Sequence, residues 1–189
     1  MHRLSDQTCS NKIMTIPNLL SIVRLMMIPV IAHAYLHRSD MLLTALLLAL
    51  SGLTDLVDGW IARRFNQISD LGKALDPVAD KLTQAVMLFC LATRHDVMRI
   101  PILLLIFKEV WTGLTGLWVI RRTGRVLGAV WHGKVTTVML YSLMIVHVLR
   151  QDIPALASNV MIAACLVMMS ISFILYTRRN IAAIREGKS

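Results

Sequence analysis

The sequence predicts an all-α integral membrane protein, a bundle of six transmembrane helices with both termini in the cytoplasm. Hydrophobic residues make up 56% of the chain and charged residues only 16%, whereas about 25% of residues in ordinary soluble domains are charged. Apolar stretches such as MLLTALLLAL and VMIAACLVMMSISFILY belong to segments of about 20 residues, the length that a helix needs to cross a bilayer. None of them shows the alternation of a membrane-barrel strand.

The apolar segments give the expected helices in order along the chain. We place them at residues 16–37, 41–64, 76–94, 100–120, 131–150 and 154–177. The first lacks a small-residue cleavage site and is followed by further spans, so we expect a retained helix rather than a signal peptide. The expected organisation is a cytoplasmic N-terminal segment, a six-helix membrane domain and a basic cytoplasmic tail, at residues 1–15, 16–178 and 179–189.

The distribution of Lys and Arg predicts the orientation. With both termini in the cytoplasm, the outside loops hold only Arg38, Arg94, Arg99 and Arg150, whereas most of the 20 basic residues lie inside. This asymmetry is what the positive-inside rule requires. The net charge of +9 then indicates basic loops beside anionic headgroups, not a nucleic-acid partner. We expect a multi-pass protein of the cell membrane whose site faces the cytoplasm.

An acidic stretch interrupts this apolar chain. Five of its 11 acidic residues are Asp55, Asp58, Asp70, Asp76 and Asp80. If a helix starts near Met41, Asp55 lies about 21 Å along it and is still within the membrane. A carboxylate near the middle of a bilayer costs about 2.5–3.5 kcal/mol. The acidic residues must therefore face a polar cavity that opens to the cytoplasm.

The spacing groups these acidic residues into two pairs. Asp55 and Asp58 share one face of the second helix, and Asp76 and Asp80 share a face of the third. A loop of about a dozen residues would let the helices run antiparallel with these faces opposed. Hard divalent ions choose such oxygen ligands, and the absence of His and Cys from the stretch argues against zinc.

Three further residues beside the acidic pairs suit a diphosphate. Gly59 and Ala62 lack bulk, so a ligand can approach the helix backbone, and Arg63 adds a cation that suits phosphate oxygens. Two metal ions could clamp the attacking and leaving oxygens of an in-line displacement.

Simpler explanations exist for single residues in this stretch. Asp76 before Pro77 fits a helix N-cap followed by proline at the first helical position. Asp70 could be a loop residue, and Asp58 could pair with Arg63 at the surface. None of these explains an acidic pair inside a membrane helix that faces a second pair.

The complete pattern resembles the signature of the CDP-alcohol phosphotransferase family. Eight positions match it without a gap, in the order Asp55-x2-Asp58-Gly59-x2-Ala62-Arg63-x8-Gly72-x3-Asp76-x3-Asp80. The resemblance implies a CDP-linked donor, commonly CDP-diacylglycerol, release of CMP, and a homodimer. It implies two divalent ions, Mg²⁺ or Mn²⁺, held by Asp55, Asp58, Asp76 and Asp80. Asp80 would also be the general base, and the CDP donor would contact Gly59, Ala62, Arg63 and Gly72. Independently of the resemblance, we expect Asn18 to line the donor cavity as a polar helper.

The acceptor alcohol is less clearly marked than the donor. The segments IPNLLSIVRLMMIPV and LGKALDPVADKL resemble the bacterial phosphatidylglycerophosphate synthase branch, which uses glycerol 3-phosphate. A phosphorylated acceptor needs cations, and the candidates are Arg24, Lys108, Arg121 and Lys134. Two features depart from that branch: Lys108 replaces an arginine, and the segment HGKVTT has Thr136 in place of a second lysine. A neutral polyol, phosphatidylglycerol (giving cardiolipin) or inositol phosphate therefore stay open as acceptors.

A divalent-cation transporter is the alternative from a different class, because acidic residues inside a membrane also mark ion pathways. The element Gly59-x2-Ala62-Arg63 argues against it, since an arginine hinders a cation path and assists a diphosphate. The chain also shows no inverted repeat, which many transporters have.

Overall fold

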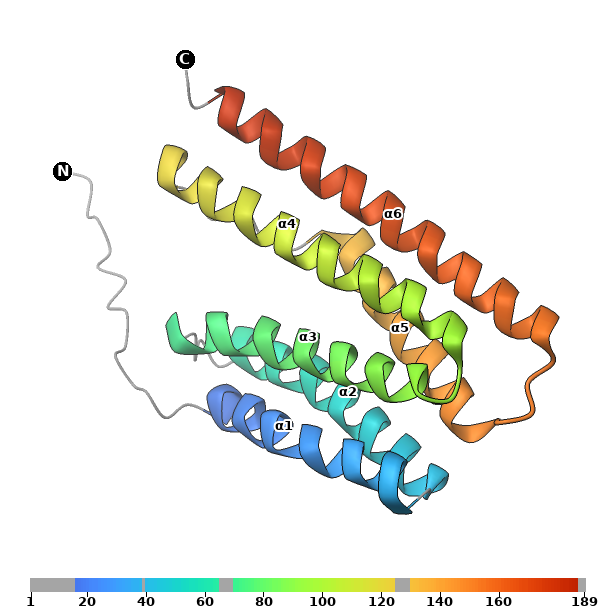
Figure 1. Cartoon of the computed structure of the whole chain (residues 1–189). Helices are drawn as coiled ribbons and strands as arrows, with labels where there is room; N and C mark the ends of the chain where they lie inside the picture. Colours follow the sequence, from blue (N-terminus) through green and yellow to red (C-terminus); the bar gives the residue numbers. More distant parts are fainter. Residues whose placement is uncertain (1–15, 39, 65–69, 125–129, 187–189) are drawn as a thin grey trace. The chain divides into compact units, whose positions relative to one another are not determined.

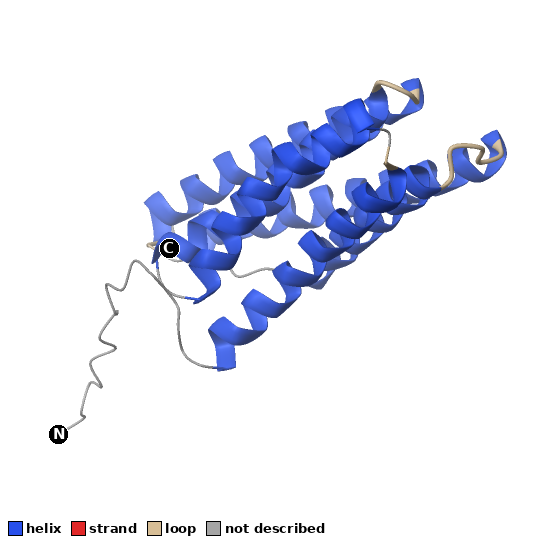
Figure 2. Ribbon diagram, turned by 90° about the horizontal axis from the view of Figure 1, so that it is seen from below, coloured by secondary structure: helices blue, strands red, loops and turns tan. Residues whose placement is uncertain are grey.

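The structure, a computed structural model of the whole chain, describes residues 16–38, 40–64, 70–124 and 130–186 (Figure 1). Nearly all of these residues are helical, and no strand occurs among them (Figure 2). The predicted all-α class is therefore confirmed. The α-helices are α1 (Ile16–His33), α2 (Met41–Arg64), α3 (Asp70–Ala92), α4 (Arg99–Thr123), α5 (Trp131–Leu149) and α6 (Ala155–Glu186). A π-helical turn (Ala34–Arg38) continues α1, and a 3-10 turn (Asp96–Met98) precedes α4.

The start of α3 differs from the prediction. The helix begins at Asp70, and Pro77 lies inside it. The interpretation of Asp76 as an N-cap is therefore wrong. A proline inside a helix costs roughly 3 kcal/mol, which is why the sequence suggested a helix start there. The expected long loop is also wrong, because only residues 65–69 separate α2 from α3.

Two helix ends in the second half of the chain extend past their predicted positions. Helix α6 runs to Glu186, beyond residue 178, where the sequence suggested the end of the membrane domain. Helix α4 ends at Thr123 and is capped by Gly124, whose positive φ of 65° places it in the left-handed conformation typical of a helix C-terminus. Its N–H donates to the carbonyl of Ile120 at 2.8 Å.

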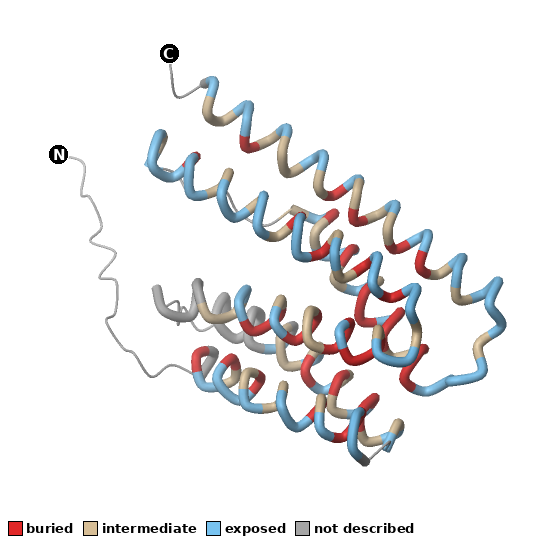
Figure 3. The backbone as a smooth tube through the Cα atoms, viewed as in Figure 1, coloured by how far each residue is buried: buried red, intermediate tan, exposed pale blue. Residues whose placement is uncertain are grey.

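The chain divides into two compact units, Met1–Val86 and Met87–Ser189, and each is described by itself. In unit 1, α1 packs against α2 around a core that includes Ile31, Tyr35, Ala45 and Leu48. In unit 2, α6 packs against both α4 and α5, and the core includes Leu105, Leu140, Leu143, Met144 and Met169. In Figure 3 the buried positions recur along each helix with exposed positions between them.

The exposed faces of the helices are apolar. Large exposed hydrophobic side chains include Leu19, Met26, Leu42 and Leu46 in unit 1, and Leu103, Phe107 and Leu114 in unit 2. Soluble monomers rarely expose so much apolar surface. Among the described residues, four helical segments are long and apolar enough to cross a membrane: Asn18–His37, Asp96–Thr123, Trp131–Leu149 and Ala155–Arg185. The shorter segment Met41–Asp55 is apolar too.

Candidate active site

The face of α1 that lies inside unit 1 is polar. Asn18, Ser21 and Arg24 are all buried there. Their spacing of three residues keeps them along one side of the helix. Burying polar groups is unfavourable unless they find hydrogen-bond partners, and this side of α1 faces the acidic helices.

Two residues of this face bind carboxylates on two different helices. The Nη1 atom of Arg24 lies 2.7 Å from Oδ1 of Asp55 on α2. The hydroxyl of Ser21 donates a hydrogen bond to Oδ1 of Asp76 on α3. Helix α1 therefore links the two acidic helices. The arginine side chain is fully buried, whereas that of Asp55 is 31% exposed and can still be reached by a ligand.

Asp80 is held from within its own helix. Both carboxylate oxygens accept hydrogen bonds from Nε2 of Gln84, each at 3.0 Å. Lys81 places its Nζ atom 3.2 Å from Oδ2. The carboxylate is largely buried, so these contacts fix its direction.

The three described carboxylates form one electrostatic group. The negative charges of Asp80 and Asp76 both act on Asp55 and repel it, and the positive charge of Arg24 attracts it. Acidic residues of α2 and α3 thus act on one another electrostatically, and their roles as metal ligands stay predictions. The sequence analysis missed Ser21 and Gln84, although the three-residue spacing from Asn18 to Ser21 to Arg24 was a readable signal.

Several predicted site positions lie where the structure describes only the backbone or nothing. Helix α2 carries the predicted Asp58, Gly59, Ala62 and Arg63, and α3 carries Gly72. Their side chains lie outside the described residues. Their predicted roles stay predictions.

The described carboxylates suit a hard divalent cation in their chemistry. Asp55, Asp76 and Asp80 offer only oxygen atoms, which Mg²⁺ and Mn²⁺ prefer. Within the described part of the chain, no three acidic, histidine or cysteine side chains form a group that could hold an ion. The predicted fourth ligand, Asp58, belongs to the part whose side chains are not described.

The cations predicted to bind the acceptor differ in their surroundings. In unit 2, Lys108 is buried, and its Nζ atom lies 2.5 Å from Oε1 of Glu109. Arg121 and Lys134 are exposed. In unit 1, Arg24 is buried against Asp55. Lys108 is therefore the one of these four that is buried within unit 2.

A second polar cluster in unit 2 surrounds His132. Its Nδ1 atom shares a hydrogen bond of 3.0 Å with Oγ of Ser172, and its ring contacts that of Tyr176 at 4.6 Å between centroids. The guanidinium carbon of Arg179 lies over the ring of Tyr176, 5.2 Å from its centroid. The sequence gave no signal that Ser172, Tyr176 or Arg179 would surround His132.

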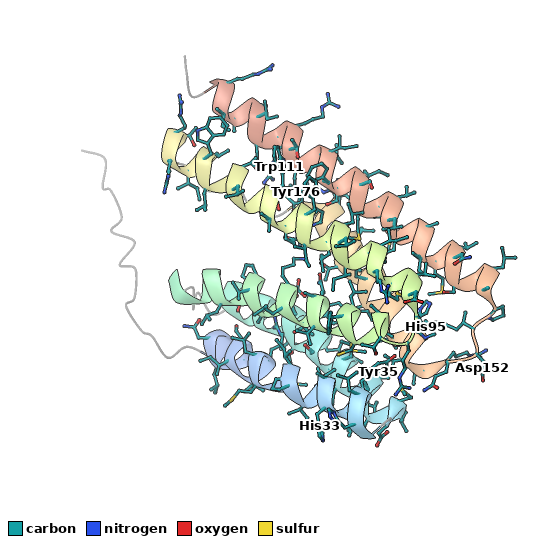
Figure 4. The ribbon with its side chains drawn as sticks, in the orientation of Figure 1. His33, Tyr35, His95, Trp111, Asp152 and Tyr176 are labelled. Carbon is teal, nitrogen blue, oxygen red and sulfur yellow. The ribbon has the colours of Figure 1, made fainter. Side chains whose placement is uncertain are left out.

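Side chains of α4 and α6 form a hydrogen bond next to this cluster. Figure 4 shows Trp111 of α4 and Tyr176 of α6 where the two helices meet. The indole Nε1 of Trp111 donates to Oγ1 of Thr177 at 3.1 Å. Thr136, which replaces the expected lysine, is buried, and its hydroxyl donates to the carbonyl of His132. That hydroxyl thus donates its hydrogen bond to the backbone of its own helix.

Comparison with known proteins decides the family. The family model described as CDP-alcohol phosphatidyltransferase matches residues 14–180. The chain belongs to this family. Membership accounts for the acidic signature, and the family is generally dependent on a divalent metal. Together with the apolar helices it marks the chain as a membrane protein.

Individual relatives of the chain cover it to different extents. It is 42% identical to the CDP-diacylglycerol–glycerol-3-phosphate 3-phosphatidyltransferase of Rickettsia bellii over 96 aligned residues. These residues make up 50% of this chain and 53% of the relative. It is 44% identical over 96 residues to the cardiolipin synthase (CMP-forming) of Rattus norvegicus, 50% of this chain and 31% of the relative. An Aquifex aeolicus protein with the first of these names is 28% identical over 177 residues, 90% of this chain and 98% of the relative. The chain thus matches about half the length of the first relatives.

Proposed function

We propose that the chain transfers the phosphatidyl group of CDP-diacylglycerol to an alcohol acceptor and releases CMP. The acceptor is glycerol 3-phosphate and the product phosphatidylglycerophosphate. The observation that carries this proposal is the group formed by Asp55, Asp76 and Asp80 in a chain of this family, with a hydrogen-bond donor held against each carboxylate.

The residues of unit 1 supply the chemistry of transfer. Two divalent ions, Mg²⁺ or Mn²⁺, would be held by Asp55, Asp58, Asp76 and Asp80. Bound there, they would neutralise charge on the diphosphate and on the departing CMP. Asp80 takes the proton from the acceptor hydroxyl, whose oxygen then attacks the lipid-linked phosphorus. The two hydrogen bonds from Gln84 keep that carboxylate directed. The CDP donor contacts Asn18, Gly59, Ala62, Arg63 and Gly72.

The acceptor assignment is supported by two of the relatives and by cations of the chain. Proteins from Rickettsia bellii and Aquifex aeolicus carry the name of a glycerol-3-phosphate phosphatidyltransferase. A phosphate group needs cationic partners, and we assign this role to Lys108, Arg121 and Lys134, whereas the fourth predicted candidate, Arg24, is bound to Asp55. Lys108 is the strongest of them, because an ionised side chain buried in a membrane helix is costly and is kept for function.

Phosphatidylglycerol, which would give cardiolipin, is a second candidate acceptor. The similarity to a Rattus norvegicus cardiolipin synthase favours it. So does Thr136, because it replaces one cation of a phosphate pocket and its hydroxyl bonds to its own helix. Inositol phosphate and a neutral polyol remain alternatives on the same chemistry. A divalent-cation transporter would not explain the family match.

The proposed placement in the membrane follows from the charge distribution. Six helices would span the cell membrane with both termini and the site on the cytoplasmic side, in agreement with the positive-inside rule. Residues 16–178 would form the membrane domain between a cytoplasmic segment at 1–15 and a tail at 179–189. The functional form would be a homodimer surrounded by membrane lipids.

Release of CMP tests the proposal directly. Purified protein is supplied with Mg²⁺ and CDP-diacylglycerol, and each acceptor is offered in a separate reaction. Release that requires glycerol 3-phosphate supports phosphatidylglycerophosphate synthesis. Release only with phosphatidylglycerol or inositol phosphate keeps the transferase and overturns the acceptor. The absence of release with every alcohol would refute the proposed function.

A further inference from the structure

The buried face of α1 contacts the acidic residues and not merely the apolar core. Ser21 and Arg24 lie one turn apart on this face, and each reaches a different helix. Ser21 donates to Asp76 of α3, and Arg24 donates to Asp55 of α2. A single helix thus supplies donors to one member of each acidic pair.

These contacts use one oxygen of each carboxylate. Ser21 and Arg24 both bond to an Oδ1 atom, that of Asp76 and that of Asp55 respectively. A carboxylate has two oxygens and about four lone-pair sites. The Oδ2 atom of each residue is not used by these two bonds and stays available to another ligand. A hydrogen bond to one oxygen fixes the plane of the carboxylate and therefore the direction in which the second oxygen can bind a ligand.

We infer that Ser21 and Arg24 are positioning residues for the divalent cation, which direct the Oδ2 atoms of Asp76 and Asp55. This inference rests on the proposed function, in which these two carboxylates are ligands. Hydrogen-bond partners of metal ligands commonly set the affinity of a site by orienting the ligand. The side of α1 that faces the acidic helices would then determine how tightly the metal binds.

Asp80 provides an internal contrast. Its carboxylate is held by Gln84, one turn further along the same helix, through both oxygens. That contact does not depend on α1. Changes in α1 should therefore affect metal binding through Asp55 and Asp76 and leave the two hydrogen bonds from Gln84 to Asp80 in place.

Ser21 is the cleaner probe of the two residues. Its hydroxyl is neutral, so its removal changes orientation without changing the charge around the metal. Removal of Arg24 would leave Asp55 without its counter-charge and would also reduce repulsion of a cation, two effects of opposite sign. Arg24→Lys keeps the charge and loses the planar donor fork of the guanidinium. It is therefore the appropriate change at that position.

The control for Ser21→Ala is Ser51→Ala. Ser51 is fully buried on α2, one turn before Asp55. Its Oγ atom has no hydrogen-bond partner among the described residues. Ser51→Ala thus removes a buried hydroxyl of the same size that touches no carboxylate. Ser21→Thr is the conservative variant, because it retains the hydroxyl.

The experiment measures Mn²⁺ binding to the full chain in detergent by electron paramagnetic resonance of the free ion. We expect Ser21→Ala to weaken Mn²⁺ binding by about 10-fold or more, within the range for lost partners of metal ligands. Arg24→Lys should weaken it comparably. Ser51→Ala should bind Mn²⁺ as the unchanged protein does, and Ser21→Thr should retain most of the affinity.

Turnover as a function of Mn²⁺ separates positioning from a general loss of structure. Ser21→Ala should need more Mn²⁺ for half-maximal CMP release and should approach the original kcat when the metal saturates. Thermal unfolding without metal checks that each variant folds. Unchanged Mn²⁺ affinity in folded Ser21→Ala and Arg24→Lys would overturn the inference. Failure of the unchanged protein to release CMP would refute the proposed function instead, and the Mn²⁺ titration would still decide the inference.

Discussion

The two units differ in the charged groups that they bury, since unit 1 combines a buried cation, Arg24, with several carboxylates. Unit 1 buries or half-buries Asp55, Asp76 and Asp80, and each carboxylate has a donor from a nearby residue. Unit 2 buries a cation, Lys108, and an imidazole, His132. The carboxylates are grouped and repel one another unless they are compensated.

Under the proposed function, this difference would give the two units different tasks. Grouped carboxylates with directed oxygens suit a divalent ion and a proton transfer, both of which determine the chemical step. The buried Lys108, whose Nζ atom lies 2.5 Å from Oε1 of Glu109, is a group of unit 2 that suits an anionic part of a substrate. If the assignment is right, changes in unit 1 should reduce kcat, whereas changes in unit 2 should raise the KM of the acceptor.

The largest expected effect is that of Asp80→Asn. The amide keeps the shape of the side chain but cannot take a proton, so CMP release should fall by at least about 100-fold, in line with the contribution of general bases. Binding of CDP-diacylglycerol should persist, because Asp55 and Asp76 keep their partners on α1. The measurements are CMP release at saturating substrates and equilibrium binding of the donor.

The matched control for this change is Asp152→Asn. Asp152 is an exposed residue in the turn between α5 and α6 (Figure 4). The same substitution there should leave CMP release unchanged. Near-normal turnover of Asp80→Asn would remove the general-base role from Asp80 and with it the contrast between the units.

A smaller effect, confined to one substrate, is expected for Lys108→Met. The methionine fills a similar volume without the charge, so glycerol 3-phosphate should lose a charged hydrogen-bond partner. Such a bond contributes about 1.5–3 kcal/mol, and its loss should raise the KM of glycerol 3-phosphate tenfold or more. The KM of CDP-diacylglycerol should stay the same. Initial rates with each substrate varied in turn measure both constants.

Arg99→Met is the control for Lys108→Met. Arg99 begins the same helix, and its ion pair with Asp96 at 2.7 Å is largely exposed, so its loss should matter little. An equal rise in both KM values for Lys108→Met would indicate a general disturbance of unit 2 and would refute its role in binding the acceptor.

The sequence predicted the all-helical class well because that class depends on a strong local pattern: apolar runs indicate membrane helices by length alone. The spacing from Asp55 to Asp80 predicted two opposed acidic pairs, of which the structure describes only the side chains of Asp55, Asp76 and Asp80. The start of α3 was predicted wrongly because Asp76 and Pro77 suit a helix start as well as a helix interior. Local preference could not show that the helix begins at Asp70 and tolerates the proline.

The partners of the site residues were beyond the reach of local patterns. Ser21 and Asp76 lie 55 residues apart in the chain, and His132 and Ser172 lie 40 apart. A single serine in an apolar helix has the same local surroundings whether it binds a carboxylate or, like Ser51, no described partner. Only the packing of helices distinguishes these cases.

The smallest expected effect concerns a close contact in unit 2. A Cβ atom at Gly133 would lie 2.6 Å from Oη of Tyr176, and the next nearest atoms of that ring lie at 3.3 and 3.4 Å. Gly133→Ala should therefore destabilise the chain by about 1–3 kcal/mol, the usual cost of overpacking, and lower its Tm. Gly113→Ala is the control, since no atom lies within 4 Å of a Cβ there, and alanine should stabilise α4 slightly.

Tyr176→Phe decides whether this contact is the cause. It removes the hydroxyl and leaves ring atoms at distances that a small shift accommodates. The double variant should therefore recover most of the Tm lost by Gly133→Ala, although Tyr176→Phe alone forfeits the weak hydrogen bond that Oη accepts from the N–H of Val130 at 3.4 Å. If the Tm losses of the two single variants simply added in the double variant, the contact between Gly133 and Tyr176 would not be the cause. Recovery of Tm together with the acceptor KM would show that the fit between Gly133 and Tyr176 holds the start of α5, where His132 and Lys134 lie, in the geometry that unit 2 needs to bind an anionic acceptor.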